Sequence, residues 1–77
     1  MSEQTQITFM QIRLIRLAAE TWNWSIDKVT ALFDKMDVFE YIESGYGIFH
    51  CEGDETILEE ITEFLERKGI SIHEGID

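Results

Sequence analysis

Proline is absent from the sequence, and cysteine occurs only once, at Cys51. Without proline, helices can continue uninterrupted, so the breaks between them have to come from glycine and from capping residues. A single cysteine excludes an intramolecular disulfide, which fits a reducing compartment but does not require one. Because a chain of 77 residues buries only about 60% of its unfolded surface, its stability has to come from one compact core or from a partner.

Basic residues are also scarce. Six lysines and arginines stand against sixteen acids, which gives a formal net charge of −10. The segment 36–66 contains ten acidic residues and no lysine or arginine. Such a chain should repel the phosphates of nucleic acids and the surfaces of anionic membranes, and should attract a basic protein partner. Plain solubility is the alternative explanation of this charge.

Long apolar runs are missing too, since no stretch approaches the ~20 residues that cross a bilayer. The opening residues, MSEQTQITF, lack the basic and apolar regions of a secretory signal. A hydrophobic content of 44%, however, is too high for a disordered chain. We therefore expect one soluble, cytoplasmic domain that spans residues 1–77 without a linker or an internal repeat.

Hydrophobic periodicity predicts four helices, at about residues 5–23, 26–37, 38–51 and 55–68. The expected core positions of the first helix are Ile7, Met10, Leu14, Ile15, Leu17, Ala18 and Trp22. Ser25 is the expected N-cap of the second helix. The expected core positions of the second helix are Ile26, Val29, Leu32, Phe33 and Met36.

The last helix has the clearest boundaries. We expect Asp54 to be its N-cap and Gly69 to follow its end. Its predicted core positions are Ile57, Leu58, Ile61, Phe64 and Leu65. Its predicted acidic face consists of Glu55, Glu59, Glu60, Glu63 and Glu66. The residues after it should form a short extended tail, packed by Ile70 and Ile72.

The segment VFEYIESGYGIFHCEG allows two interpretations. As a helix it places one set of residues on a single apolar face, namely Val38, Tyr41, Ile42, Gly45, Ile48 and Phe49. A glycine on that face would permit close approach of another helix. As an alternative, a short strand at about 47–51 would pair with 70–73 and produce an α+β fold. The helical pattern is the better match, so we predict an all-α, compact four-helix domain.

Few residues suggest chemistry. Cysteine–histidine catalysis would combine Cys51 with His50 or His73, but neighbouring residues on a helix project about 100° apart. Metal ligands at paired spacings, such as CxxC with HxxxH, are not found in the sequence. We therefore expect no enzymatic activity, no metal and no cofactor, and retain a metal- or thiol-dependent site at His50 and Cys51 as a remote alternative.

One feature of the first helix exceeds what a core requires. Phe9 and Ile12 fall off its main apolar stripe, beside Arg13 and Arg16. Aromatic residues and arginine are enriched at the centres of protein interfaces, so these four residues form a candidate interface. The alternative is that another helix or the tail covers this side.

Residues 32–69 resemble a family of short bacterial proteins of unknown function that share a phrase like LFxxxxVxxYIxxxYxxxHxxGxxxIxxxIxxxL. The matching positions are Leu32, Phe33, Val38, Tyr41, Ile42, Tyr46, His50, Gly53, Ile57, Ile61 and Leu65. With the first helix, the resemblance extends over roughly residues 7–69. Gly45 and Gly47 depart from the pattern, which places the end of the third helix in question. The resemblance implies no activity or cofactor, but it implies a gene beside that of an ADP-ribosyltransferase-like protein, as in a toxin–antitoxin pair.

These observations predict a non-enzymatic, acidic interaction protein that docks on a basic protein partner in an antitoxin-like or regulatory role. A homo-oligomeric structural protein with no second partner is the alternative. Direct binding of nucleic acid is not expected, because the second helix offers only Lys28 and Lys35, which nearby acids offset.

Overall fold

The computed structural model describes residues 1–72, and in this range it contains four helices and no strand. The helices are α1 (Glu3–Trp22), α2 (Ile26–Lys35), α3 (Val38–Phe49) and α4 (Asp54–Arg67). The all-α prediction is confirmed. The alternative strand pair is wrong, because residues 47–49 belong to α3 and residues 70–72 are in no strand. His73 lies outside the described residues.

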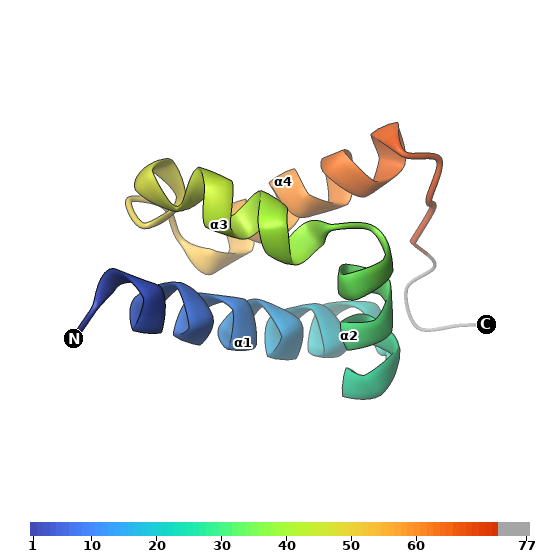
Figure 1. Ribbon diagram of the computed structural model, residues 1–77. Coiled ribbons are helices and arrows are strands. Elements are labelled where there is room, and N and C mark those ends of the chain that lie inside the picture. The colour runs from blue at the N-terminus through green and yellow to red at the C-terminus, as the bar shows by residue number, and fades with distance from the viewer. Residues whose placement is uncertain (73–77) are drawn as a thin grey trace.

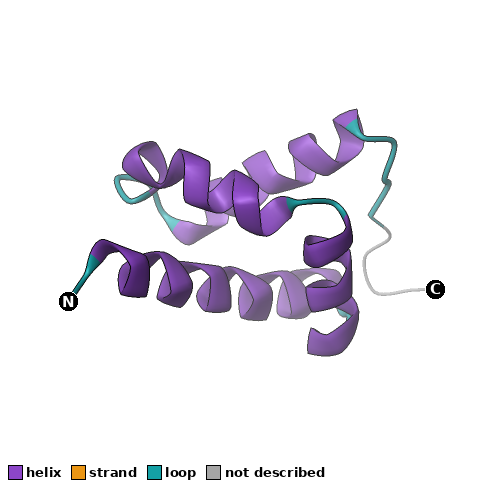
Figure 2. Ribbon diagram, in the orientation of Figure 1, coloured by secondary structure: helices purple, strands orange, loops and turns teal. Residues whose placement is uncertain are grey.

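The helix α1 runs along the molecule and packs against each of the other three helices (Figure 1). The chain turns into α2 at the C-terminal end of α1, then runs back over α1 as α3 and returns as α4. Short turns make these connections at the two ends of the molecule (Figure 2). The α3–α4 turn therefore lies at the same end as the N-terminus. No helix within residues 1–72 has both the length and the apolar character needed to cross a membrane.

Serine residues cap the N-termini of the first two helices. Ser2 accepts a hydrogen bond from the backbone N–H of Thr5 at 3.1 Å, and α1 begins at Glu3, earlier than predicted. Ser25 accepts one from the backbone N–H of Lys28 at 3.1 Å, which confirms the predicted cap of α2. Each cap satisfies one of the N–H groups that a helix start leaves without a partner.

The C-terminal end of α4 was predicted correctly from the sequence, but its N-cap was not. Gly53, not Asp54, is the N-cap, and Asp54 is the first residue of the helix. At the other end Gly69 has a φ of 89°, as its predicted position after the helix requires. The N–H of Gly69 donates to Glu66 O at 3.0 Å and that of Ile70 to Leu65 O at 2.9 Å, so these two carbonyls of the last turn are satisfied.

The core consists of apolar side chains from all four helices, and no polar residue of the described chain is buried. Its largest fully buried members are Trp22, Phe33, Leu14, Ile42, Ile57, Ile61, Leu65, Val29 and Val38. Trp24 packs edge-on against Trp22, with ring centroids 5.3 Å apart, and covers the end of the core. Ile70 and Ile72 of the tail pack against the core, as predicted.

Two predicted core positions are wrong. Ile26 is 53% exposed because it stands in the first turn of α2, before the helix reaches the core. Ile48 is 69% exposed although Phe49 is only 4% exposed. Neighbouring helix positions point about 100° apart, so the burial of Phe49 turns Ile48 towards solvent. The helix α3 also ends at Phe49, two residues before the predicted end at residue 51.

Gly45 was expected to admit a neighbouring helix, but the structure gives it a different partner. A Cβ atom added at Gly45 would lie 2.6 Å from Cε2 of Phe49, one turn further along α3. The missing side chain therefore makes room for a buried ring of the same helix. Gly47 has no such neighbour, since a Cβ atom there would meet nothing within 4 Å.

Substituting these two glycines separately should give opposite results. Gly45→Ala should lower the free energy of unfolding by about 1–3 kcal/mol, because the added methyl group would displace the buried ring of Phe49. Gly47→Ala, the matched control, should raise it by about 0.5–1 kcal/mol, because alanine is the better helix former. Urea denaturation measures both values, and a stabilising Gly45→Ala would contradict the packing described.

Candidate functional site

The outward face of α4 borders a groove against the C-terminal half of α1. Its lining residues are Thr21, Trp22, Glu55, Leu58, Glu59, Thr62, Glu63 and Glu66, around a volume of about 600 Å³. The four glutamates share one face because they recur every three or four residues along the helix. Trp22 and Leu58, which are only 1% and 5% exposed, form an apolar floor. We call this site the acidic groove.

The negative charge of the acidic groove is not neutralised within the chain. Among residues 1–72 the structure has two ion pairs, Arg13 with Asp54 and Lys68 with Asp37. Neither involves a glutamate of the groove. Four carboxylates therefore face solvent above side chains that are almost fully buried, an arrangement that attracts cationic groups.

Glu60 was predicted to belong to the same acidic face, but the structure places it on another side of α4. Its carboxyl lies within hydrogen-bonding reach of Glu52, in the α3–α4 turn. It also acts on Tyr41 of α3, whose ring stacks on Phe64 with centroids 4.2 Å apart. Burial raises the pKa of Tyr41, and the negative charge of Glu60 raises it further.

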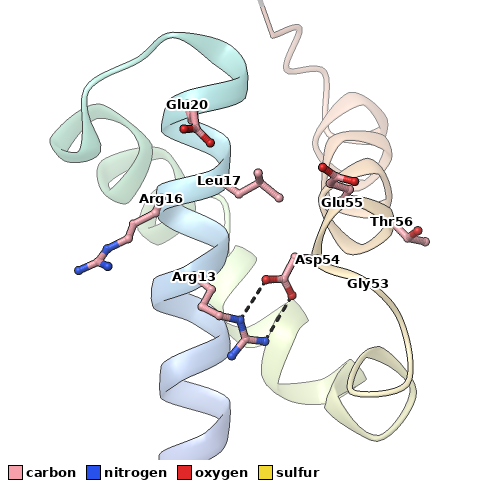
Figure 3. Close-up of a pocket in the computed structure, with 8 residues that line it drawn as sticks. All are labelled: Arg13, Arg16, Leu17, Glu20, Gly53, Asp54, Glu55 and Thr56. Carbon is pink, nitrogen blue, oxygen red and sulfur yellow. Dashed lines mark hydrogen bonds and ion pairs between the residues drawn. The ribbon is translucent and has the colours of Figure 1, made fainter.

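The predicted interface on α1 is exposed in part. Phe9 is 48% and Ile12 41% exposed, so no described helix covers them. Arg13 is engaged within the chain, since its Nε and Nη2 donate to Asp54 at 3.0 and 3.3 Å. The hydrogen bond to Asp54 raises the pKa of Arg13 above its ordinary value. Arg16 makes no ion pair with any residue in 1–72 and points away from α4 (Figure 3).

The Arg13–Asp54 pair crosses a second, open groove of about 540 Å³ between α1 and the start of α4 (Figure 3). Both arginine and carboxylate side chains line it, including Arg16, Glu20 and Glu55. Because neither sign of charge dominates, this groove does not select for a class of ligand in the way that the acidic groove does.

His50 and Cys51 lie at the exposed end of α3, where His50 is the C-cap. The Cys51 sulfur is 3.8 Å from both Nδ1 and Nε2 of His50. The lone-pair directions of the two ring nitrogens diverge, so an atom equally distant from both lies on the axis of neither. The side chains are in contact, but the imidazole is not oriented to remove the thiol proton.

Metal ligands are likewise dispersed in the described part of the chain. Within residues 1–72 no three histidine, cysteine, aspartate or glutamate side chains are grouped closely enough to hold an ion.

Two features of these surfaces escaped sequence reasoning. The groove itself was missed because Trp22 and Leu58, which are core residues as predicted, also line it. The contact of Glu52 with Glu60 was missed because the two are eight residues apart, on either side of the turn at Gly53. Helical periodicity does not extend across such a turn, so no signal in the sequence could have shown it.

Comparison with known proteins identifies a family. Residues 9–68 match the family described as "Protein of unknown function (DUF3791)". No curated protein and no solved structure matches the chain. The match includes most of α1, the whole of α2, α3 and α4, and both surfaces described above. The chain therefore belongs to the DUF3791 family of proteins of unknown function.

Proposed function

We propose that this chain is a non-enzymatic protein-binding module that docks a basic segment of a partner protein in the acidic groove. The observation that carries this proposal is the row of four glutamates along α4, unpaired within the described chain, above the apolar floor of Trp22 and Leu58. Charge of one sign around an apolar centre is the arrangement that combines steering of a partner with stable contact.

The spacing of the glutamates defines the kind of segment that fits. Glu55 and Glu66 are eleven residues apart, so the row extends over about 16 Å of helix. Lysine or arginine side chains repeated along one face of a helix or strand would meet several carboxylates at once.

An antitoxin-like role is the biological form of this proposal. The family resemblance described above implies a neighbouring gene for an ADP-ribosyltransferase-like protein, and a chain with a net charge of −10 is suited to bind a basic partner. In this role the chain acts by occupying a functional surface of the partner. The protein would then be cytoplasmic and bacterial.

Neutralising the groove should weaken partner binding. A variant with Glu55, Glu59, Glu63 and Glu66 all changed to glutamine should bind the partner about tenfold or more weakly, because charge steering is lost. The partner is first captured from a lysate of the native host and purified, and its affinity for each variant is then measured by calorimetry at low and high salt. If the partner is a toxin, its expression should arrest growth, and co-expression of the wild-type chain, but not of this variant, should restore it.

The matched control changes the same number of exposed acids away from the groove, at Glu3, Asp34, Glu40 and Glu43. It has the same net charge as the groove variant, so it separates a local site from the overall charge. Equal weakening by both variants, or a captured protein whose affinity does not depend on salt, would contradict the proposal.

Self-association is the second candidate function, and the exposed Phe9 and Ile12 support it. The segment 4–19 contains no acid, so the outward side of α1 is the place where two copies repel each other least. Arg16 has no ion-pair partner in the described chain and is available to a second copy. Burying such residues at an interface would also add to the stability of a small core.

Removing the apolar side chains tests this second function. If α1 pairs with a second copy, analytical ultracentrifugation should show a dimer of the wild type at micromolar to millimolar concentrations. Phe9→Ser combined with Ile12→Ser should weaken that dimer by about tenfold or more, since each buried apolar side chain contributes about 1.5–3 kcal/mol. Ile48→Ser, at an exposed position of α3, should leave it unchanged. A wild type that remains monomeric throughout would exclude self-association.

A further inference from the structure

The connection between α2 and α3 lacks the residues that break the chain at the other two turns. The side chain of Ser25 caps the start of α2, and Gly53 precedes α4. Residues 26–44, by contrast, contain neither glycine nor proline. Because those are the residues that interrupt helices most strongly, the composition of the α2–α3 connection is compatible with a continuous helix.

The structure interrupts the helix at a single residue of this connection. Asp37 has a φ of 63° and a ψ of 30°, in the left-handed region, although it is not glycine. Helical hydrogen bonds continue on both sides of it. The N–H of Met36 donates to Leu32 O at 3.0 Å, and the N–H of Tyr41 donates to the carbonyl of Asp37 at 3.1 Å. The bond from the N–H of Asp37 to Asp34 O is long, at 3.4 Å.

The side chain of Asp37 does little to hold this conformation. Asp37 is the N-cap of α3 but makes no capping hydrogen bond. Its carboxylate lies 3.9 Å from Nζ of Lys68, and its side chain is 61% exposed, so the ion pair is weak. Left-handed backbone is unfavourable at residues other than glycine, and these contacts offset little of that cost.

We infer that Asp37 is a hinge for the exchange of helices between two copies of this chain. In the exchanged dimer, α2 and α3 join into one helix over residues 26–49, and each copy packs its α3 and α4 on α1 and α2 of the other. Straightening relieves the left-handed residue and gives the first N–H groups of α3 the carbonyls at the end of α2 as partners. In the monomer, α3 instead turns away from α2 and runs back over α1 (Figure 1).

A second copy is the occupant that fits the opened chain. Straightening one chain alone would expose core residues that are fully buried, such as Leu14 and Ala18 of α1 and Ile61 of α4. A second copy supplies the same α3 and α4 surfaces, so the contacts between the two halves form again between chains, including the Arg13–Asp54 ion pair. The acidic groove, which α1 and α4 line together, is then assembled from two chains.

Substitutions at Asp37 test the hinge on the full chain. Each variant is unfolded in urea, refolded at a series of concentrations up to millimolar, and measured by analytical ultracentrifugation. Asp37→Ala should raise the association constant of the dimer by about tenfold or more, because alanine favours helix and disfavours left-handed backbone in both copies. Asp37→Gly should lower it by about tenfold or more, because glycine adopts the left-handed conformation readily and weakens a continuous helix.

Asn23→Ala is the matched control, since it also replaces a left-handed residue, with a φ of 58°, by alanine. The α1–α2 turn is the same in the monomer and in the exchanged dimer, so this variant should leave the association constant unchanged. Phe9→Ser combined with Ile12→Ser should leave it unchanged as well, which separates the exchanged dimer from self-association through the outward side of α1.

An NMR measurement identifies the exchange itself. Isotope-labelled and unlabelled Asp37→Ala chains are mixed in urea and refolded together, and the dimer is isolated. Gln6 of α1 and Tyr46 of α3, which share a hydrogen bond of 2.7 Å, should then give a nuclear Overhauser effect between chains. The inference is overturned if Asp37→Ala stays monomeric at millimolar concentration, if Asp37→Gly dimerises as strongly, or if the Gln6–Tyr46 signal of the dimer arises only within one chain.

Discussion

The fold depends on one apolar stripe along α1. Its buried members are Ile7, Met10, Leu14, Ala18 and Trp22, and α2, α3 and α4 each pack against this helix. A chain of 77 residues cannot supply two independent cores, so every other helix has to bury its own apolar face on the same support. The order of the turns follows from this constraint, because α2, α3 and α4 take successive positions around a single central helix.

Because the apolar residues gather around α1, the outer faces of the helices are polar. Two of the few basic residues form ion pairs that connect one helix to the next. Arg13 connects α1 to the first residue of α4, and Lys68 connects the end of α4 to Asp37, just before α3. Both pairs are exposed, so each contributes only about 0–1 kcal/mol. Their larger effect is on the distribution of negative charge. Arg13 and Lys68 each form an ion pair with an aspartate, so neither neutralises a glutamate of the acidic groove.

Periodicity was sufficient to predict the all-α class and most core positions, because an amphipathic helix on a single core is a local pattern repeated many times. The wrong predictions concern positions whose environment depends on tertiary contacts and not on the local pattern. Ile48 was misplaced because two adjacent apolar residues cannot both face inwards, and only packing shows that Phe49 does. Asp54 was read as a cap, whereas Arg13, which is distant in sequence, holds its side chain. The acidic row was visible in the sequence, but its apolar floor and the separation of Glu60 depend on tertiary contacts.

The acidic row on α4 is more than a helix needs for solubility. Glu55 and Glu59, then Glu59 and Glu63, are like charges four residues apart, and each such pair costs an isolated helix about 0.2–0.5 kcal/mol. Glu66 lies in the last turn, where the helix dipole favours a cation instead. Selection for stability alone would have placed a lysine at one of these positions, which would also form a favourable pair with the glutamate before it. The proposed docking of a basic segment would account for a row of charges that weakens its own helix.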